Sequence, residues 1–159
     1  MRILGIDPGS VVTGYGVIDK SGNYLRHVIH GEIKPPKASL LSDVLMDISR
    51  KLRDVIVKTS PQAVCLENIF YGKNVRSLIR QAHVRGVVIF TCADCSIPVF
   101  EFSPLEIKKA VVGYGRAEKR QVQMMVKAIL KLDTLPPADA ADALAAAICQ
   151  ANFAKEQPI

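Results

Sequence analysis

The stretch Arg2-Ile-Leu-Gly-Ile-Asp-Pro-Gly-Ser10 limits how the rest of the chain can fold. Its apolar run predicts a buried β-strand over residues 2–7, which ends on Asp7 before a Pro-Gly-Ser turn. Further strands are predicted over residues 13–19 and 24–33, with turn-forming residues between them. Three successive strands with short connections predict an antiparallel meander.

Helices and strands alternate after the meander. The apolar spacing of residues 41–57 predicts a helix, and residues 63–67 form a short apolar strand that also ends on an acid, Glu67. A helix between two strands implies a crossover, so we expect this strand to run parallel to the first. A fifth strand is predicted over residues 97–102.

Four more helices are predicted. They cover residues 74–93, residues 104–112, the segment that follows the basic loop 113–120, and residues 138–153. The first carries one continuous apolar stripe: Val75, Leu78, Ile79, Ala82, Gly86, Ile89, Phe90 and Ala93. In the helix after the basic loop, the residues expected to point inward are Val122, Met125, Val126 and Ile129. The last helix is rich in alanine, so it can approach a sheet closely.

These elements predict one α/β domain over residues 1–159, with a five-stranded mixed sheet of three antiparallel and then two parallel strands, flanked by helices. The composition, 49% hydrophobic and 23% charged, is typical of a globular protein. The net charge of +6 would attract a polyanion, and nucleic acid is the first to consider, although many proteins with this charge bind none.

The cysteines and the absence of long apolar runs indicate a soluble, cytoplasmic chain without a membrane segment. The four cysteines, which are expected to be free thiols, are Cys65, Cys92, Cys95 and Cys149. Cys92 and Cys95 form a C-x-x-C, which is compatible with half a zinc site or a redox pair. No second pair is present, and the two cysteines close a helix, whereas reactive thiols are favoured where a helix begins.

Four acids are the candidate chemical centre. Asp7 and Glu67 end neighbouring parallel strands, so both are expected at one edge of the sheet, and Asp139 and Asp142 lie one turn apart at the start of the last helix. Taken singly, Asp7 suits a turn acid, Glu67 a solvent contact at a strand end, and Asp139 an N-cap. Together they would repel one another unless cations neutralised them, and oxygen ligands select Mg²⁺ or Mn²⁺. A pair of such ions is typical of phosphodiester hydrolysis.

Motifs around these acids occur in order over nearly the whole chain: Gly5-Ile-Asp-Pro-Gly-Ser10, Thr13-Gly-Tyr-Gly16, Glu67-Asn-Ile-Phe70, Lys73-Asn74, Gly113 through Gln123, and Ala138-Asp-Ala-Ala-Asp-Ala-Leu144. The ordered set resembles the RuvC family of Holliday-junction endodeoxyribonucleases. The resemblance implies a ribonuclease-H-like fold, a homodimer, and a branch-migration motor of RuvA and RuvB as partner. It also implies hydrolysis of two strands of like polarity at four-way junction DNA, with two Mg²⁺ ions per active site, or Mn²⁺ as a substitute, and 5′-phosphate and 3′-hydroxyl products.

The resemblance also assigns residue roles. Asp7, Glu67, Asp139 and Asp142 match the catalytic, metal-binding acids, although a histidine can take the position of Asp139. Phe70 matches an aromatic residue inserted among junction bases, with a core residue as the alternative. Lys108 and Lys119 match backbone contacts near the cut, where the alternative is solvated helix charge. Further DNA-binding residues are inferred from charge: Lys73, Arg76, Arg80, Arg116 and Arg120.

Two rival functions remain open in the sequence. Asp7-Pro-Gly-Ser10 with Gly14 and Gly16 also resembles the first phosphate loop of the actin and sugar-kinase ATPases, but a second such loop is absent. A junction-binding module that has lost cleavage is the other rival, and it would leave all four acids idle.

Overall fold

The computed structural model describes residues 1–37, 39–68, 74–153 and 158–159. Among these residues, the strands form one sheet in the order β3-β2-β1-β4-β5. The strands are β1 (Arg2–Asp7), β2 (Thr13–Ser21), β3 (Tyr24–Ile33), β4 (Ala63–Glu67) and β5 (Val99–Phe102). The helices are α1 (Leu41–Thr59), α2 (Val75–Asp94), α3 (Pro104–Val112), α4 (Lys119–Leu130) and α5 (Ala138–Phe153).

The strand directions confirm the predicted sheet. β1 pairs antiparallel with β2, and β2 pairs antiparallel with β3. β4 runs parallel to β1 and to β5 because α1 and α2 carry the chain back across the sheet before each of these strands. The carboxyl ends of β1 and β4 therefore lie side by side.

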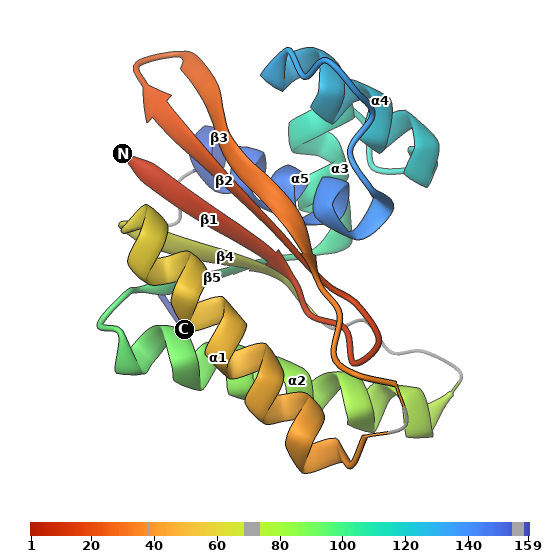
Figure 1. The fold of residues 1–159 in the computed structure, drawn as a ribbon. Helices are drawn as coiled ribbons and strands as arrows, with labels where there is room; N and C mark the ends of the chain where they lie inside the picture. Colours follow the sequence, from red (N-terminus) through yellow and green to blue (C-terminus); the bar gives the residue numbers. More distant parts are fainter. Residues whose placement is uncertain (38, 69–73, 154–157) are drawn as a thin grey trace.

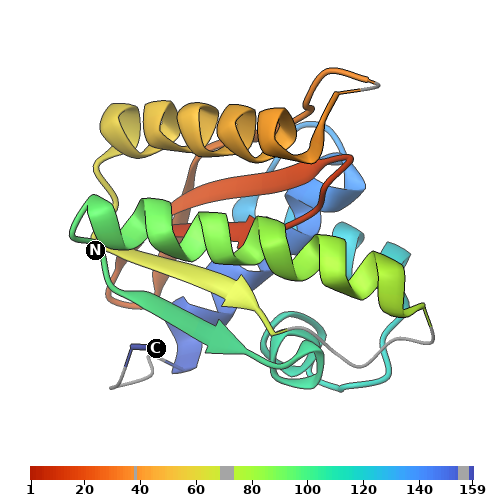
Figure 2. The same ribbon diagram turned by 90° about the horizontal axis from the view of Figure 1, so that it is seen from below.

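Helices cover both faces of the sheet (Figures 1 and 2). α1 and α2 pack on one face, over a core that includes Leu4, Val64 and Leu66. α3, α4 and α5 cover the other face, where Phe102 and Leu144 are buried. Among the described residues, no helix is long and apolar enough to cross a membrane.

The alanine-rich helix α5 packs in close contact with the strands beneath it, as predicted. A Cβ atom added to Gly5 of β1 would overlap the main-chain carbonyl of Ala143, and one added to Gly14 of β2 would overlap that of Asp139. Glycine in the strands and alanine in the helix thus remove the side chains that would hold the two elements apart. This contact brings the first turn of α5 to the end of β1.

Most of the predicted apolar stripe of α2 lies on the surface, although Leu78 and Ile89 are partly buried and Ile89 packs against the core. Val75, Ile79 and Phe90 are 56%, 52% and 68% exposed. The face that packs on the sheet is the opposite one, and it includes Val84 and Val88, which are fully buried. Periodicity detected a true helix face, but this helix has two apolar faces and the shorter one meets the core.

Smaller differences concern single residues and element ends. Met125 was expected to point inward, but it is 38% exposed, whereas Val122 and Val126 are buried as predicted. Leu130 takes the third buried position of α4 because it continues the four-residue spacing. β5 begins two residues later than predicted, at Val99.

The C-x-x-C lies where α2 ends, as predicted. Cys92, in the last turn of α2, is buried in the core, and Cys95 is the C-cap residue of this helix. Burial raises the pKa of the Cys92 thiol to about 12, the opposite of what a reactive thiol requires. All four cysteines are free thiols.

Candidate active site

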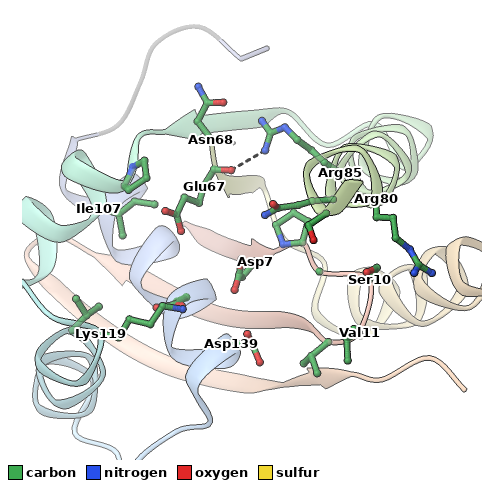
Figure 3. Close-up of a pocket in the computed structure, with 18 of the residues that line it drawn as sticks. Asp7, Ser10, Val11, Glu67, Asn68, Arg80, Arg85, Ile107, Lys119 and Asp139 are labelled. Carbon is green, nitrogen blue, oxygen red and sulfur yellow. Dashed lines mark hydrogen bonds and ion pairs between the residues drawn. The ribbon is translucent and has the colours of Figure 1, made fainter. Parts of the chain in front are cut away.

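A cavity of about 880 Å³ opens at the carboxyl ends of β1 and β4 (Figure 3). The turn after β1, the first half of α2, and the starts of α3, α4 and α5 form its walls. All four predicted acids line it: Asp7, Glu67, Asp139 and Asp142. The structure therefore brings together residues that lie up to 135 positions apart in the sequence.

Each acid reaches the cavity through the local fold. Asp7 and Glu67 are the last residues of β1 and β4, which run parallel. Asp139 and Asp142 come from the first turns of α5, which the glycine contacts seat on the sheet. Asp139 is the second residue of this helix and so does not occupy the N-cap position, which the sequence left open as its alternative role. In Figure 3 the Asp7 carboxylate lies at the centre, with Glu67 on one side and Asp139 on the other.

The turn after Asp7 is fixed by a buried hydroxyl. Thr13 Oγ1 donates a 2.8 Å hydrogen bond to the Gly9 carbonyl and accepts one of 3.3 Å from the Gly9 amide. Thr13 itself is fully buried. The turn therefore holds Ser10 and Val11 at the rim of the cavity, and Val11 is 79% exposed there.

The acids influence one another's protonation. Burial and repulsion from Asp142, Glu67 and Asp139 raise the pKa of Asp7 from 3.8 to about 7. Burial and then repulsion from Asp142 raise the pKa of Glu67. The pKa of Asp142 is raised chiefly by burial. Folding has thus gathered negative charges that do not easily ionise together.

Two lysines partly offset this repulsion. Lys119 Nζ lies 3.3 Å from Asp142 Oδ2, although the lysine side chain is 82% exposed. Attraction to Asp142 is the largest cause of the raised pKa of Lys119. Lys108 also lines the cavity and lowers the pKa of both Glu67 and Asp142. One exposed ammonium and one partly buried ammonium cannot neutralise four carboxylates.

The donor set fits divalent cations. Carboxylate oxygens are the ligands that Mg²⁺ and Mn²⁺ prefer, and the raised pKa of Asp7 reflects negative charge that a cation would relieve. No three metal-binding side chains are gathered closely enough to form a ready-made ion site among residues 1–37, 39–68, 74–153 and 158–159. The acids instead surround the cavity, so ions would draw them inward.

The predicted DNA-binding residues divide into three groups. Arg80, Lys108 and Lys119 line the cavity. Three arginines are exposed and do not line the cavity: Arg76, Arg116 and Arg120. Phe70 and Lys73 lie outside the described residues.

Sequence reasoning missed Arg85, which also lines the cavity. It is only 8% exposed, and its Nη1 donates a 2.8 Å hydrogen bond to the main-chain carbonyl of Glu67. The available signal was a charged residue within the apolar run Val84 to Val88.

Known proteins resemble this chain over most of its length. Residues 3–150 match the family model described as crossover junction endodeoxyribonuclease RuvC. The RuvC proteins of Geotalea uraniireducens and Syntrophotalea carbinolica are each 48% identical to it over 96% of this chain, and over 89% and 94% of their own lengths.

Solved structures agree. RuvC of T. thermophilus, solved in complex with a Holliday junction substrate, superposes with a TM-score of 0.93 at 29% identity, covering 100% of this chain and 99% of that one. The five-stranded sheet and its helices thus have the predicted ribonuclease-H-like architecture. With its carboxylate-lined cavity at the carboxyl ends of β1 and β4, the chain belongs to the RuvC family of crossover junction endodeoxyribonucleases.

Proposed function

We propose that this protein resolves four-way DNA junctions by paired, metal-dependent hydrolysis of two strands of like polarity. The observation that carries the proposal is the group of four carboxylates around one cavity in a chain of net charge +6. Family membership supports the choice of a four-way junction as substrate. The phosphate loop rival loses support, because the family model that matches residues 3–150 is that of a junction endonuclease.

Asp7, Glu67, Asp139 and Asp142 would hold two Mg²⁺ ions, with Mn²⁺ as a substitute. When bound, the ions would lower the pKa of a water molecule and stabilise negative charge on the departing 3′ oxygen. Hydrolysis then joins the water oxygen to phosphorus and breaks the bond from phosphorus to the 3′ oxygen. The products are a 5′-phosphate and a 3′-hydroxyl, which a ligase joins.

The basic residues would position the sugar-phosphate backbone at the acids. Lys108, Lys119 and Arg80 support this role because they line the cavity. Lys119 is well suited to contact the phosphate near the cut, since it is exposed and its Nζ already lies beside Asp142. Contacts of this kind carry no base specificity, so binding should weaken with added salt.

A homodimer would present two active sites to two strands related by symmetry. The exposed stripe of α2 supports this arrangement and suggests where the partner binds. Large apolar side chains, including Ile79 and Phe90, flank the exposed small residues Ala82 and Gly86, and a Cβ atom on Gly86 would meet nothing within 4 Å. A second copy of α2 fits such a face, because a two-fold axis sets each residue against its own equivalent. Cooperation with a RuvA and RuvB motor is supported by family membership alone.

The test is incubation of the purified protein with a synthetic mobile four-way junction and Mg²⁺. We expect symmetric nicks that a ligase seals, and no comparable cleavage of linear duplex of the same sequence. Asp7→Asn and Glu67→Gln should bind the junction without cutting it. Cleavage by Asp7→Asn at the wild-type rate would contradict the assignment of the site, and a wild-type protein that binds without cutting would favour the non-enzymatic rival.

A further inference from the structure

Arg85 is a buried charge in an otherwise apolar part of α2. Its neighbours on the same helix face, Val84 and Val88, belong to the core. Toward the start of the helix this face becomes polar, with Ser77, Arg80 and Gln81 lining the cavity, so Arg85 stands where the core ends and the active site begins (Figure 3). A buried guanidinium is unfavourable unless its N–H groups are paired.

The guanidinium connects α2 to two neighbouring strands. Its Nη1 donates to the Glu67 carbonyl at 2.8 Å, and its Nη2 forms an ion pair with Oε1 of Glu101 on β5. Glu101 pairs with Leu66 in the β4–β5 register, one position before Glu67. The Arg85 side chain thus anchors the main chain of Glu67, the last residue of β4.

This contact differs from those of the other cations in the cavity. Lys119 and Lys108 attract the Glu67 carboxylate and lower its pKa. Arg85 is instead directed at the Glu67 main chain and is balanced by Glu101. It is therefore placed to fix where Glu67 lies while leaving the carboxylate available to a cation.

An anchor is needed at this point for two reasons. Repulsion from Asp142 acts on the Glu67 carboxylate and favours its displacement from the other acids. The strand also ends here: β4 stops at Glu67, and the main-chain bond that follows joins the Asn68 amide to the Phe102 carbonyl, at 2.8 Å. A main-chain bond from a rigid helix would resist the repulsion.

We propose that Arg85, held by Glu101, is a positioning residue that keeps the Glu67 carboxylate in reach of the cations bound by Asp7 and Asp142. The proposal rests on the proposed nuclease function. Supporting contacts of this type change metal affinity or activity by about 10- to 100-fold when removed. The loss should therefore appear in metal dependence and not in DNA affinity.

The experiment compares Arg85→Met, Arg85→Lys and Glu101→Gln with wild type and with Arg53→Met, a control on α1 whose arginine pairs with Asp94 away from the cavity. Mn²⁺ affinity is measured by calorimetry without DNA, single-turnover cleavage is followed across a Mg²⁺ titration, and junction affinity is measured in EDTA. Arg85→Met should weaken Mn²⁺ binding and raise the half-saturating Mg²⁺ concentration by about 10-fold or more. Junction affinity should change less than about twofold, and high Mg²⁺ should restore part of the rate.

Arg85→Lys retains the charge and one bond, so it should lie between Arg85→Met and wild type. If Arg85→Met does not fold, Arg85→Lys and Glu101→Gln carry the test. Wild-type metal dependence in these variants would overturn the proposal, as would equal losses of junction binding and cleavage. Failure of wild type to cut would instead refute the nuclease function, which separates the two outcomes.

Discussion

Replacing Asp7 with asparagine should stabilise the metal-free protein at neutral and alkaline pH while abolishing cleavage. The stabilisation follows from the electrostatics of the cavity. Asp7 has its pKa raised from 3.8 to about 7 because it is buried among Asp142, Glu67 and Asp139. A neutral amide of nearly the same shape removes the charge without opening a cavity.

The magnitude follows from this shift. About three pKa units correspond to about 4 kcal/mol between the two protonation states. Because the cavity is open to water that partly screens the acids, we expect about half of this, or about 2 kcal/mol. For a chain of this size that corresponds to roughly 4–8 °C in Tm.

The pH dependence has a definite sign. Below pH 3.8 the Asp7 carboxyl is protonated in both folded and unfolded chains, so the wild type retains its full stability. As the pH rises toward 7, the unfolded carboxyl ionises first and the folded state binds more protons, so stability falls. Above pH 7 the loss is complete. Glu67 and Asp142, whose pKa values are also raised, contribute in the same direction.

The assay is thermal unfolding in EDTA at pH 4 and pH 8, followed by circular dichroism. The difference between Asp7→Asn and wild type should be large at pH 8, much smaller at pH 4, and reduced at pH 8 when Mg²⁺ neutralises the wild-type acids. Asp54→Asn, an exposed acid of α1 away from the cavity, is the matched control and should change little at either pH. An equal difference at both pH values would refute the electrostatic explanation.

Three further predictions concern the DNA contact, the dimer and the packing of α5. Lys119→Ala should slow cleavage and lower the slope of log binding constant against log salt by about one released counterion. Unchanged binding and cleavage would contradict the proposed phosphate contact of Lys119. Ile79→Asp should give a monomer by sedimentation, whereas Met46→Asp, which is 71% exposed on α1, should not; a dimer in both would place the interface elsewhere. Gly5→Ala should lower the free energy of unfolding by about 1–3 kcal/mol in urea, because its Cβ meets the main chain of α5. Gly16→Ala, which chiefly meets the side chain of Leu144, should lower it less, and equal losses would contradict the rigid-contact argument.

The position of the acids was predictable because it depends on few variables. A buried strand that ends on Asp7 and a second that ends on Glu67 meet at one edge once a crossover makes them parallel. The alanine content of α5 indicated close packing, and Asp139 and Asp142 then followed from helical spacing. The glycines that receive α5 could have been read in the same way, as small residues opposite small residues.

The contacts of Arg85 were not predictable, because they depend on the depth at which α2 lies on the sheet. Arg85 would be a solvent-exposed cation if α2 were rotated by a quarter turn about its own axis. Its partner Glu101 is 16 positions away and on a different element, and its other partner is a main-chain carbonyl that leaves no trace in the sequence. Sequence patterns report side-chain type, whereas this contact is set by the position of backbone atoms.

The reversed orientation of α2 has a physical reason that also bears on function. A helix with one apolar stripe turns it to the core, because burial of apolar area is the dominant favourable term. α2 carries a second apolar face, with Val84 and Val88, and the strands beneath it accept that face. The longer stripe, with Ile79 and Phe90, then stays exposed in the isolated chain, where it would be unfavourable unless a partner covered it. A second copy bound to this stripe would rest on the helix that also walls the active site and, through Arg85, holds Glu67.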